Sequence, residues 1–234
     1  SDLILSIGSR MSVPQVGYNF PLFARAAKKI IVDIDSAELN KPSLKPDLPI
    51  QADAKEFMVE LLAQLNNAQP FEISSWLQRC QAWKLKYPVV LPEYKECKDA
   101  VNSFYFIHVL SEKLDENAAI VTDMGTSFTC TMQTFKTKLG QRLSTSGGHA
   151  SMGFGLPGAI GACIGNDRKD TICISGDGGL QMNIQELQTI VHYNLPIKLF
   201  VLNNNGYLTI KATQQNHFGR FVGAEKSSGV TCPD

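Results

Sequence analysis

The sequence has 234 residues, enough for one or two domains with a sizeable core. Its 22 basic and 22 acidic side chains balance, so no overall electric field attracts nucleic acid or an anionic membrane surface. No apolar run approaches the roughly 20 residues of a membrane span, and no N-terminal basic-then-apolar signal is present. We therefore expect neither a nucleic-acid partner nor a membrane partner.

The six cysteines are scattered and include no CxxC pair. This spacing favours free, buried thiols over a zinc site or a disulfide framework. Because free thiols are typical of a reducing compartment, we expect a cytoplasmic protein. The four histidines are equally separated along the chain and do not form a metal site.

Residues 1–65 alternate strand and helix signals. Apolar runs at 3–8 and 30–35 predict buried strands, and residues 20–29 predict a helix. Residues 53–65 carry apolar side chains at helical spacing and predict a second helix. This alternation is typical of a small α/β unit with parallel strands. No GxGxxG follows the first strand, so the motif evidence for a dinucleotide site is weak.

Two acidic residues, Asp33 and Asp35, end the second of these strands. Acids at such a position either contact the ribose of a bound nucleotide or are simply solvated. In the absence of a glycine-rich turn we favour the solvated role.

The alternation stops over residues 66–99, which predict a linker. A helix is expected around Trp76 to Trp83, and Pro88 and Pro92 then indicate irregular chain.

Residues 100–234 return to alternating elements and predict the second unit. Asn183 and Glu186 resemble a capping box at the start of a helix. The order of elements is that of a doubly wound parallel sheet, so the predicted fold class is α/β with two parallel-sheet units. We expect helices at 104–114 and 183–193, strands at 118–125, 170–179 and 195–207, and a loop that enters a helix at 148–165.

The stretch GDGG at 176–179 places one carboxylate among glycines, and NNNG follows after one helix and one strand. Neighbouring parallel strands end at the same edge of a sheet, so Asp177 and Asn204, 27 positions apart, should face each other there. Carboxylate and amide oxygens suit Mg²⁺ or Ca²⁺, and Mg²⁺ completes its shell with phosphate oxygens and water. Glycine amides would hold the same phosphates. We favour this metal–diphosphate interpretation over a turn or cap role for Asp177; without GK[ST] the stretch is not a P-loop.

This pairing of GDG with a later Asn pair resembles the signature of thiamine diphosphate enzymes. Residues 176–207 and 146–162 are similar to the acetolactate synthase branch of that family. By this resemblance 1–65 is the C-terminal part of a middle domain, 66–99 a linker with a helix, and 100–234 a C-terminally incomplete thiamine diphosphate-binding domain. The chain opens on a strand and stops at TCPD, so we expect a longer protein that begins with a pyrimidine-binding domain.

The resemblance also implies a set of cofactor contacts. Asp177, the Asn204 side chain and the Gly206 carbonyl would bind the metal, and a loop at 122–127 would clasp the diphosphate from the other side. For Met152, which falls where backbone groups hold the aminopyrimidine ring, a core methionine is the alternative. The predicted cofactor-binding residues are Gly125, Thr126, Ser127, Ala150, Met152, Gly176, Asp177, Gly178, Gly179, Asn204, Gly206 and Tyr207.

The implied activity is thiamine diphosphate- and Mg²⁺-dependent decarboxylation and carboligation of a 2-oxo acid such as pyruvate, in which the cofactor acts as electron sink. In the family the catalytic glutamate comes from the pyrimidine domain of a partner subunit, so no catalytic residue is named here. We expect this fragment to be inactive alone, and the full-length protein to be a homodimer or homotetramer. The alternatives are a related 2-oxo acid decarboxylase without carboligation and a non-catalytic module that binds a metal–diphosphate ligand.

Four features depart from the acetolactate synthase pattern. Residues 208–221, directly after NNNGY, are unlike the synthases at this point. Thr126 and Ser127 stand where Gln-His is usual, and His149 stands where an apolar residue is usual. Residues 8–20 lack the acidic-basic cluster that contacts FAD in the synthases. These departures argue against FAD and leave the product open. For His149 a proton-transfer role and a structural role are both open.

Overall fold

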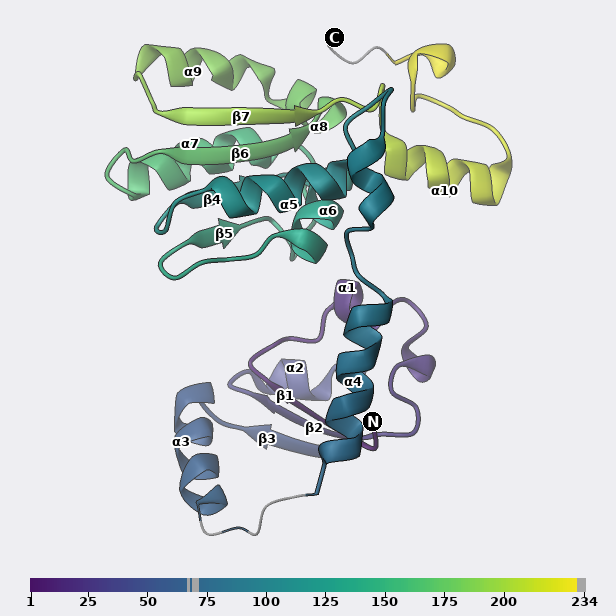
Figure 1. Ribbon diagram of the computed structural model, residues 1–234, viewed down its shortest axis with the longest axis vertical. Coiled ribbons are helices and arrows are strands. Elements are labelled where there is room, and N and C mark those ends of the chain that lie inside the picture. Colours follow the sequence, from purple (N-terminus) through teal and green to yellow (C-terminus); the bar gives the residue numbers. More distant parts are fainter. Residues whose placement is uncertain (67, 69–71, 231–234) are drawn as a thin grey trace. The chain divides into compact units, whose positions relative to one another are not determined.

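The computed structural model describes residues 1–66, 68 and 72–230. The chain divides into two compact units, Ser1–Arg79 and Cys80–Asp234, each built on its own sheet (Figure 1). Both sheets are entirely parallel, which confirms the predicted α/β class. The terminal TCPD segment and its Cys232 lie outside the described residues.

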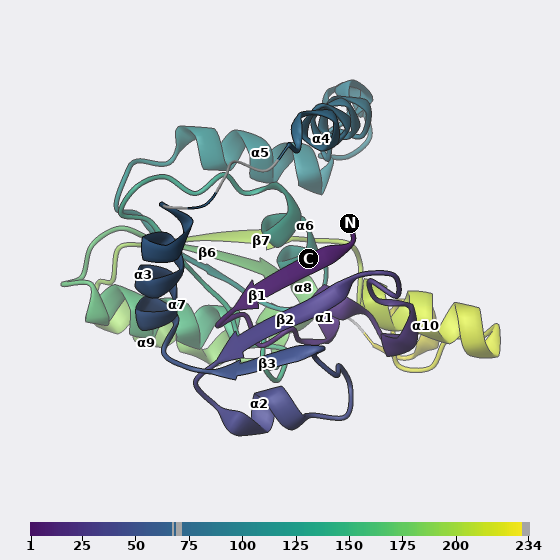
Figure 2. The same cartoon turned by 90° about the horizontal axis from the view of Figure 1, so that it is seen from below.

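Unit 1 is a three-stranded sheet in the order β1-β2-β3, with β2 in the middle (Figure 2). Its core joins Ile31 of β2 to Val16, Leu39 and Leu44 from the surrounding helices and loops. Asp53 caps the last helix by accepting hydrogen bonds from two backbone N–H groups of its first turn. The elements are β1 (Leu3–Ile7), α1 (Val13–Val16), a 3₁₀ helix (Phe20–Leu22), β2 (Lys28–Asp33), α2 (Ser36–Asn40), β3 (Leu48–Gln51) and α3 (Ala54–Leu65). The predicted linker helix is α4 (Ser74–Lys86), at the boundary between the units.

The helix predicted at 20–29 is wrong. Only Phe20–Leu22 is helical, as a single 3₁₀ turn, and Ala24 then has a φ of 44°, in the left-handed region. Pairing of β2 with β1 explains the difference, because the strand already begins at Lys28, whose N–H donates to the carbonyl of Asp2. The apolar side chains at 20–29 are therefore used in a turn, where tertiary packing overrides helix propensity.

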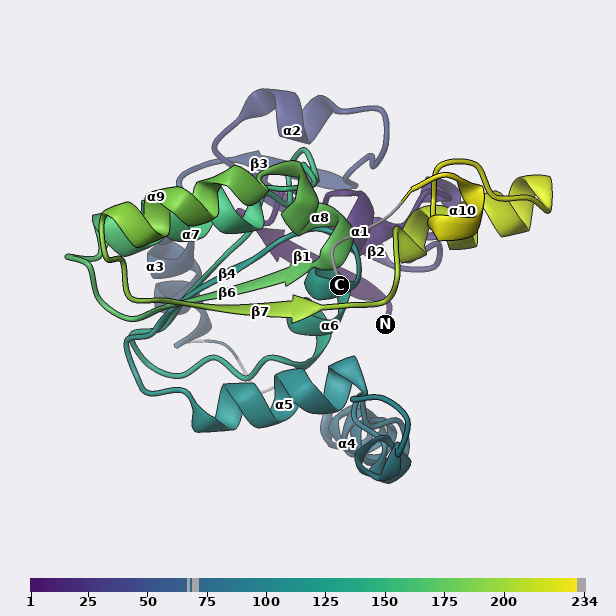
Figure 3. The ribbon, with the colours of Figure 1, turned by 90° about the horizontal axis from the view of Figure 1, so that it is seen from above.

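Unit 2 is a four-stranded sheet in the order β5-β4-β6-β7. Figure 3 shows α5 and α6 on one face of this sheet and α7 and α9 on the other. Successive side chains of β6 point to opposite faces of the sheet and belong to two different hydrophobic clusters. Ile172 and Ile174 pack with Ile107 of α5, whereas Cys173 packs with Ala159 of α7. This is the predicted doubly wound arrangement. The elements are α5 (Ser103–Lys113), β4 (Ala119–Thr122), α6 (Thr126–Thr134), β5 (Arg142–Ser144), α7 (Gly155–Gly165), β6 (Thr171–Gly176), α8 (Asp177–Met182), α9 (Leu187–His192), β7 (Ile197–Leu202) and α10 (Leu208–Phe218), with short 3₁₀ turns at Pro92–Glu96, Ile184–Glu186 and Lys226–Ser228.

The capping box predicted at Asn183 and Glu186 is also wrong. The side chain of Asn183 makes no cap hydrogen bond and instead donates from Nδ2 to the carbonyl oxygen of Gly153 at 2.8 Å. Glu186 accepts a hydrogen bond from the hydroxyl of Thr189. The side-chain amide of Asn183 is therefore bonded to the loop at Gly153, distant in sequence, rather than to the start of its own helix.

Two predictions from composition can be compared with the described part of the chain. The thiols of Cys130, Cys163 and Cys173 are free and buried, while those of Cys80 and Cys97 are free and more exposed. In the same part of the chain no helix has the length and apolar character needed to cross a membrane.

Candidate cofactor site

The carboxyl ends of β6 and β7 bring the three predicted metal ligands to one edge of the sheet. Gly176 of β6 is in register with Leu202 of β7, so Asp177 and the turn at 203–206 follow directly at neighbouring positions. Asp177 begins α8 and is only 1% exposed. Its Oδ2 accepts a 2.8 Å hydrogen bond from the backbone N–H of Gly206. The juxtaposition expected from parallel pairing is therefore present.

A small cavity of about 50 Å³ lies at this edge and is lined by nearly all of the predicted site. Three further lining residues, Met124, Leu208 and Thr209, were not predicted; Met124 and Leu208 each adjoin a predicted residue, and Thr209 lies two positions after Tyr207. The predicted residues that line it are Gly125, Thr126, Met152, Gly176, Asp177, Gly178, Gly179, Asn204, Gly206 and Tyr207.

Ser127 and Ala150 do not line the cavity. Ser127 is fully buried and its hydroxyl donates to the carbonyl of Met124 at 3.0 Å, which shapes the loop from within. Ala150 is exposed and has a φ of 55°. The neighbouring His149 is exposed as well. Direct cofactor contacts by Ser127 and Ala150, and both roles considered for His149, stay predictions.

The side chain of Asn204 is the strongest indication of a ligand at this edge. Its Oδ1 is buried and has no hydrogen-bond partner among the described residues. A buried acceptor without a donor is rare in proteins and costs about 1–3 kcal/mol. A cation would satisfy this oxygen, and the same turn carries the Gly206 carbonyl, which accepts a hydrogen bond from Leu208 and keeps a second lone pair.

The donor set at this edge fits a hard cation. Asp177 supplies a carboxylate, Asn204 an amide oxygen and Gly206 a carbonyl, which are the oxygen ligands that Mg²⁺ and Ca²⁺ prefer. Among residues 1–66, 68 and 72–230 no cluster of three or more His, Cys, Asp or Glu side chains could hold a metal. Softer metals that need thiolate or imidazole ligands are therefore not favoured here.

Two glycines at the cavity are required by close packing. A Cβ on Gly178 would lie 2.4 Å from the ring of Tyr207. Gly206 has a φ of 131°, and a Cβ there would lie 2.4 Å from the carbonyl oxygen of Ala224. Only glycine allows both approaches. Glycine is therefore required in both GDGG and NNNG by close packing within the protein, in addition to any ligand that these motifs hold.

Sequence reasoning missed a buried carboxylate behind the cavity. Asp123 follows β4, is 1% exposed and accepts hydrogen bonds from the backbone N–H groups of Met124 and Gly153 and from the Ser175 hydroxyl. The two more distant partners lie 30 and 52 positions away, so no local pattern reveals them. An acid in a short polar turn after a buried strand is the only available signal.

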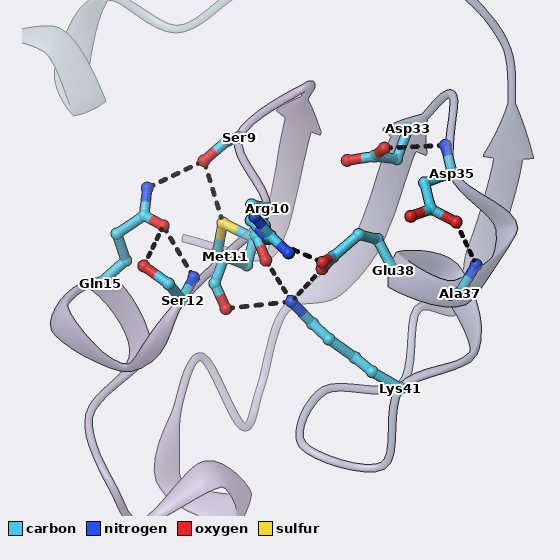
Figure 4. A network of polar contacts seen from close by, with 10 residues as sticks. All are labelled: Ser9, Arg10, Met11, Ser12, Gln15, Asp33, Asp35, Ala37, Glu38 and Lys41. Atoms are coloured by element: carbon cyan, nitrogen blue, oxygen red, sulfur yellow. Dashed lines mark hydrogen bonds and ion pairs between the residues drawn. The ribbon is translucent and has the colours of Figure 1, made fainter. Parts of the chain in front are cut away.

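In unit 1 the polar groups at the carboxyl edge of the sheet contact one another (Figure 4). Glu38 accepts hydrogen bonds from Arg10 and from Lys41. The Lys41 ammonium, and less strongly the Arg10 guanidinium, lowers the pKa of Glu38 below its ordinary value. Asp33 is buried, contrary to the solvated role expected for it, and accepts a hydrogen bond from the N–H of Asp35. Asp35 is exposed as expected and accepts from the N–H of Ala37 at the start of α2.

Two family models match the chain. Residues 1–61 match the central domain of thiamine pyrophosphate enzymes, and residues 123–232 match their C-terminal thiamine pyrophosphate-binding domain. The second match covers every residue that lines the cavity.

Over most of its length the chain is similar to curated acetolactate synthases. The large subunit from Pyropia yezoensis is 37% identical over 221 residues, which is 93% of this chain and 36% of that protein. The isozyme 1 large subunit from Escherichia coli K12 is 36% identical over 93% of this chain and 37% of its own length. The chloroplastic acetolactate synthase 2 of Nicotiana tabacum is 38% identical over 87% of this chain and 30% of its own. The chain thus spans about a third of the length of these relatives.

Proposed function

The chain belongs to the thiamine pyrophosphate enzyme family, and from this premise we propose that it forms the central and cofactor-binding parts of an enzyme that uses thiamine diphosphate and Mg²⁺ to join or decarboxylate 2-oxo acids. The proposed substrate class is 2-oxo acids such as pyruvate, in line with relatives named acetolactate synthase. The observation that carries the proposal is the buried Oδ1 of Asn204, which has no hydrogen-bond partner in the described part of the chain and lines the same cavity as the buried carboxylate of Asp177.

In this proposal Asp177, Asn204 and the Gly206 carbonyl would hold Mg²⁺. The cation resolves an electrostatic conflict, because the carboxylate of Asp177 would otherwise repel the diphosphate that the surrounding backbone N–H groups attract. The loop at 124–126 faces the cavity from the end of β4 and would bind the diphosphate from the opposite side. There Thr126 begins α6, whose first-turn N–H groups favour anions.

When bound, thiamine diphosphate supplies the carbanion-stabilising chemistry. The residues of this chain bind and orient its diphosphate and keep water from that end of the pocket. No side chain of the described part is assigned as the catalytic acid or base. We propose that a glutamate for this role comes from a pyrimidine-binding domain of a partner subunit, so that the working protein is a homodimer or homotetramer.

Activity assays on the full-length protein test the function. With pyruvate, thiamine diphosphate and Mg²⁺ we expect two pyruvate molecules to be joined into a 2-hydroxy-3-keto acid with release of one CO₂, and no turnover in EDTA. Acetaldehyde with CO₂ would instead indicate a decarboxylase without carboligation. A protein that binds the cofactor but consumes no 2-oxo acid would refute the enzymatic proposal and favour a non-catalytic binding module.

A further inference from the structure

Asp123 occupies a central position behind the cofactor cavity without lining it. Its backbone N–H donates to the carbonyl of Ile174 at 2.8 Å and so extends the pairing of β4 with β6 past the end of β4. This pairing fixes the backbone of Asp123 on the sheet, and the side chain is 1% exposed. The carboxylate is thus held inside the protein on a rigid strand end.

Three segments of the chain donate hydrogen bonds to this carboxylate. Oδ1 accepts from the N–H of Met124 at 2.8 Å and from the N–H of Gly153 at 3.0 Å. Oδ2 accepts from the hydroxyl of Ser175 at 2.8 Å. A carboxylate is well suited to this position because it only accepts hydrogen bonds and has lone pairs for all three donors. Because Asp123 does not line the cavity and both of its oxygens accept hydrogen bonds from the protein, we assign it to holding loops rather than the cation.

Two glycines of separate motifs make room for the same side chain. A Cβ on Gly155, at the start of α7, would lie 2.8 Å from the Cβ of Asp123. A Cβ on Gly179, in α8, would lie 2.5 Å from Asp123 Oδ2. Neither glycine has a positive φ, so its backbone would accept alanine. The need for glycine at both positions therefore comes mainly from Asp123.

Each segment that Asp123 contacts also reaches the cavity. Met124 lines it and leads into Gly125 and Thr126, Gly153 follows the lining residue Met152, and Gly179 lines it directly. The carbonyl of Gly153 is fixed in turn by Asn183 Nδ2 at 2.8 Å. The loop after β4, the loop before α7 and the junction of β6 with α8 thus converge on one buried carboxylate.

We propose that Asp123 is a positioning residue that fixes these three segments in the geometry that binds the diphosphate and ring of thiamine diphosphate, before the cofactor arrives. The inference rests on the proposed function. Its physical basis is preorganisation, since loops already held in the binding geometry do not have to be ordered on binding.

The first test is calorimetric titration of the full-length protein with thiamine diphosphate at saturating Mg²⁺. Asp123→Ala should weaken binding by about 10–100-fold, the range for residues that orient direct ligands. Asp123→Asn should stay within about threefold of wild type, because Oδ1 still accepts from both N–H groups and Ser175 can accept from Nδ2. Asp33→Ala is the matched control: it removes another buried strand-end acid, in unit 1, and should leave cofactor affinity unchanged.

The second test displaces Asp123 without removing a polar group, in case Asp123→Ala fails to fold. Gly155→Ala pushes on the Asp123 side chain and should weaken binding by about tenfold or more. Gly161→Ala, on the same helix with open space around its Cβ, should bind as wild type does. If wild type binds and both Asp123→Ala and Gly155→Ala bind as tightly, the positioning role is overturned while the site assignment stands. If wild type itself does not bind, the proposed function fails and this inference fails with it.

Discussion

Asp177 and Gly206 lie 29 positions apart and are joined by a 2.8 Å hydrogen bond from the Gly206 amide to Asp177 Oδ2. The bond links the first residue after β6 to the turn after β7 and holds Asn204, two residues before Gly206, beside the carboxylate. It leaves the other carboxylate oxygen of Asp177 for a ligand. This relationship connects the fold to the proposed chemistry, because parallel pairing of β6 and β7 alone brings the two motifs together.

Asp177→Ala should remove Mg²⁺-dependent cofactor binding. The variant loses a negative ligand and leaves the Gly206 N–H without its acceptor, and loss of one partner of a buried charged contact costs about 2–5 kcal/mol. We expect the dissociation constant for thiamine diphosphate at saturating Mg²⁺ to rise at least about 100-fold. Glu186→Ala, which alters an acid outside the cavity lining, is the control and should change the constant little.

Asn204→Ala should separate binding from stability. Because Oδ1 of Asn204 is buried without a partner in the described structure, its removal should leave the free energy of unfolding within about 1 kcal/mol of wild type, while cofactor affinity falls at least about tenfold. Urea unfolding and calorimetry measure the two quantities. Asn216→Ala changes an exposed asparagine of α10 outside the cavity lining and serves as the control for affinity. A large loss of stability in Asn204→Ala would show that the side chain supports the fold rather than a ligand.

Gly206→Ala should destabilise unit 2 more than an equivalent change elsewhere. Its φ of 131° is accessible essentially to glycine alone, and a Cβ would meet the Ala224 carbonyl, so we expect a loss of about 2–3 kcal/mol. Gly219→Ala introduces a similar positive-φ alanine, at 63°, with nothing near the new Cβ, and should lose about 1 kcal/mol. Equal losses in urea unfolding would contradict the steric account.

The thiol of Cys173 should make stability depend on pH in the alkaline range. Burial, and to a lesser degree the Asp123 carboxylate, raises its pKa from 9.0 to about 12. The unfolded chain therefore loses this proton first, and the contribution to stability is complete below pH 9.0 and is lost as the pH rises towards 12, by about 1.4 kcal/mol per unit. The unfolding free energy of Cys173→Ala should fall less steeply over this range. Parallel slopes for the two proteins would refute the assignment.

The purified full-length protein should carry no FAD. At the carboxyl edge of unit 1 the charged groups Arg10, Glu38 and Lys41 bond to one another, and Lys41 also donates to the backbone carbonyls of Arg10 and Met11. These groups would have to leave one another to bind a dinucleotide. The visible absorbance of the protein before and after dialysis against FAD is the measurement. Stoichiometric flavin that survives dialysis would contradict this expectation.

The sequence was most informative where a ligand-binding motif directly follows a predicted strand. Apolar runs before GDGG and NNNG mark the neighbouring strands β6 and β7, and their parallel pairing brings Asp177 and Asn204 to the same cavity. Short elements were missed: β5 has three residues, and β3 has four, one of them Pro49. Such segments carry too few residues for a period of two to be recognised.

Other failures come from contacts between distant residues. The helix predicted at 20–29 does not form because strand pairing begins at Lys28. The cap predicted at Asn183 does not form, and its side chain donates a hydrogen bond to the Gly153 carbonyl instead. Asp123 was missed for the same reason, since its donors Gly153 and Ser175 belong to other motifs. Where the outcome depends on a single long-range hydrogen bond, local sequence offers no periodic signal from which to infer it.

The most direct test of the central claim is calorimetric titration of the full-length protein with thiamine diphosphate, first with Mg²⁺ and then with EDTA. We predict saturable binding with one site per chain in Mg²⁺, loss of binding in EDTA, and loss of binding in Asp177→Ala despite an intact fold. Binding that persists in EDTA, or that is unchanged in Asp177→Ala, would contradict the assignment of Asp177 and Asn204 as the metal site at this edge of the sheet.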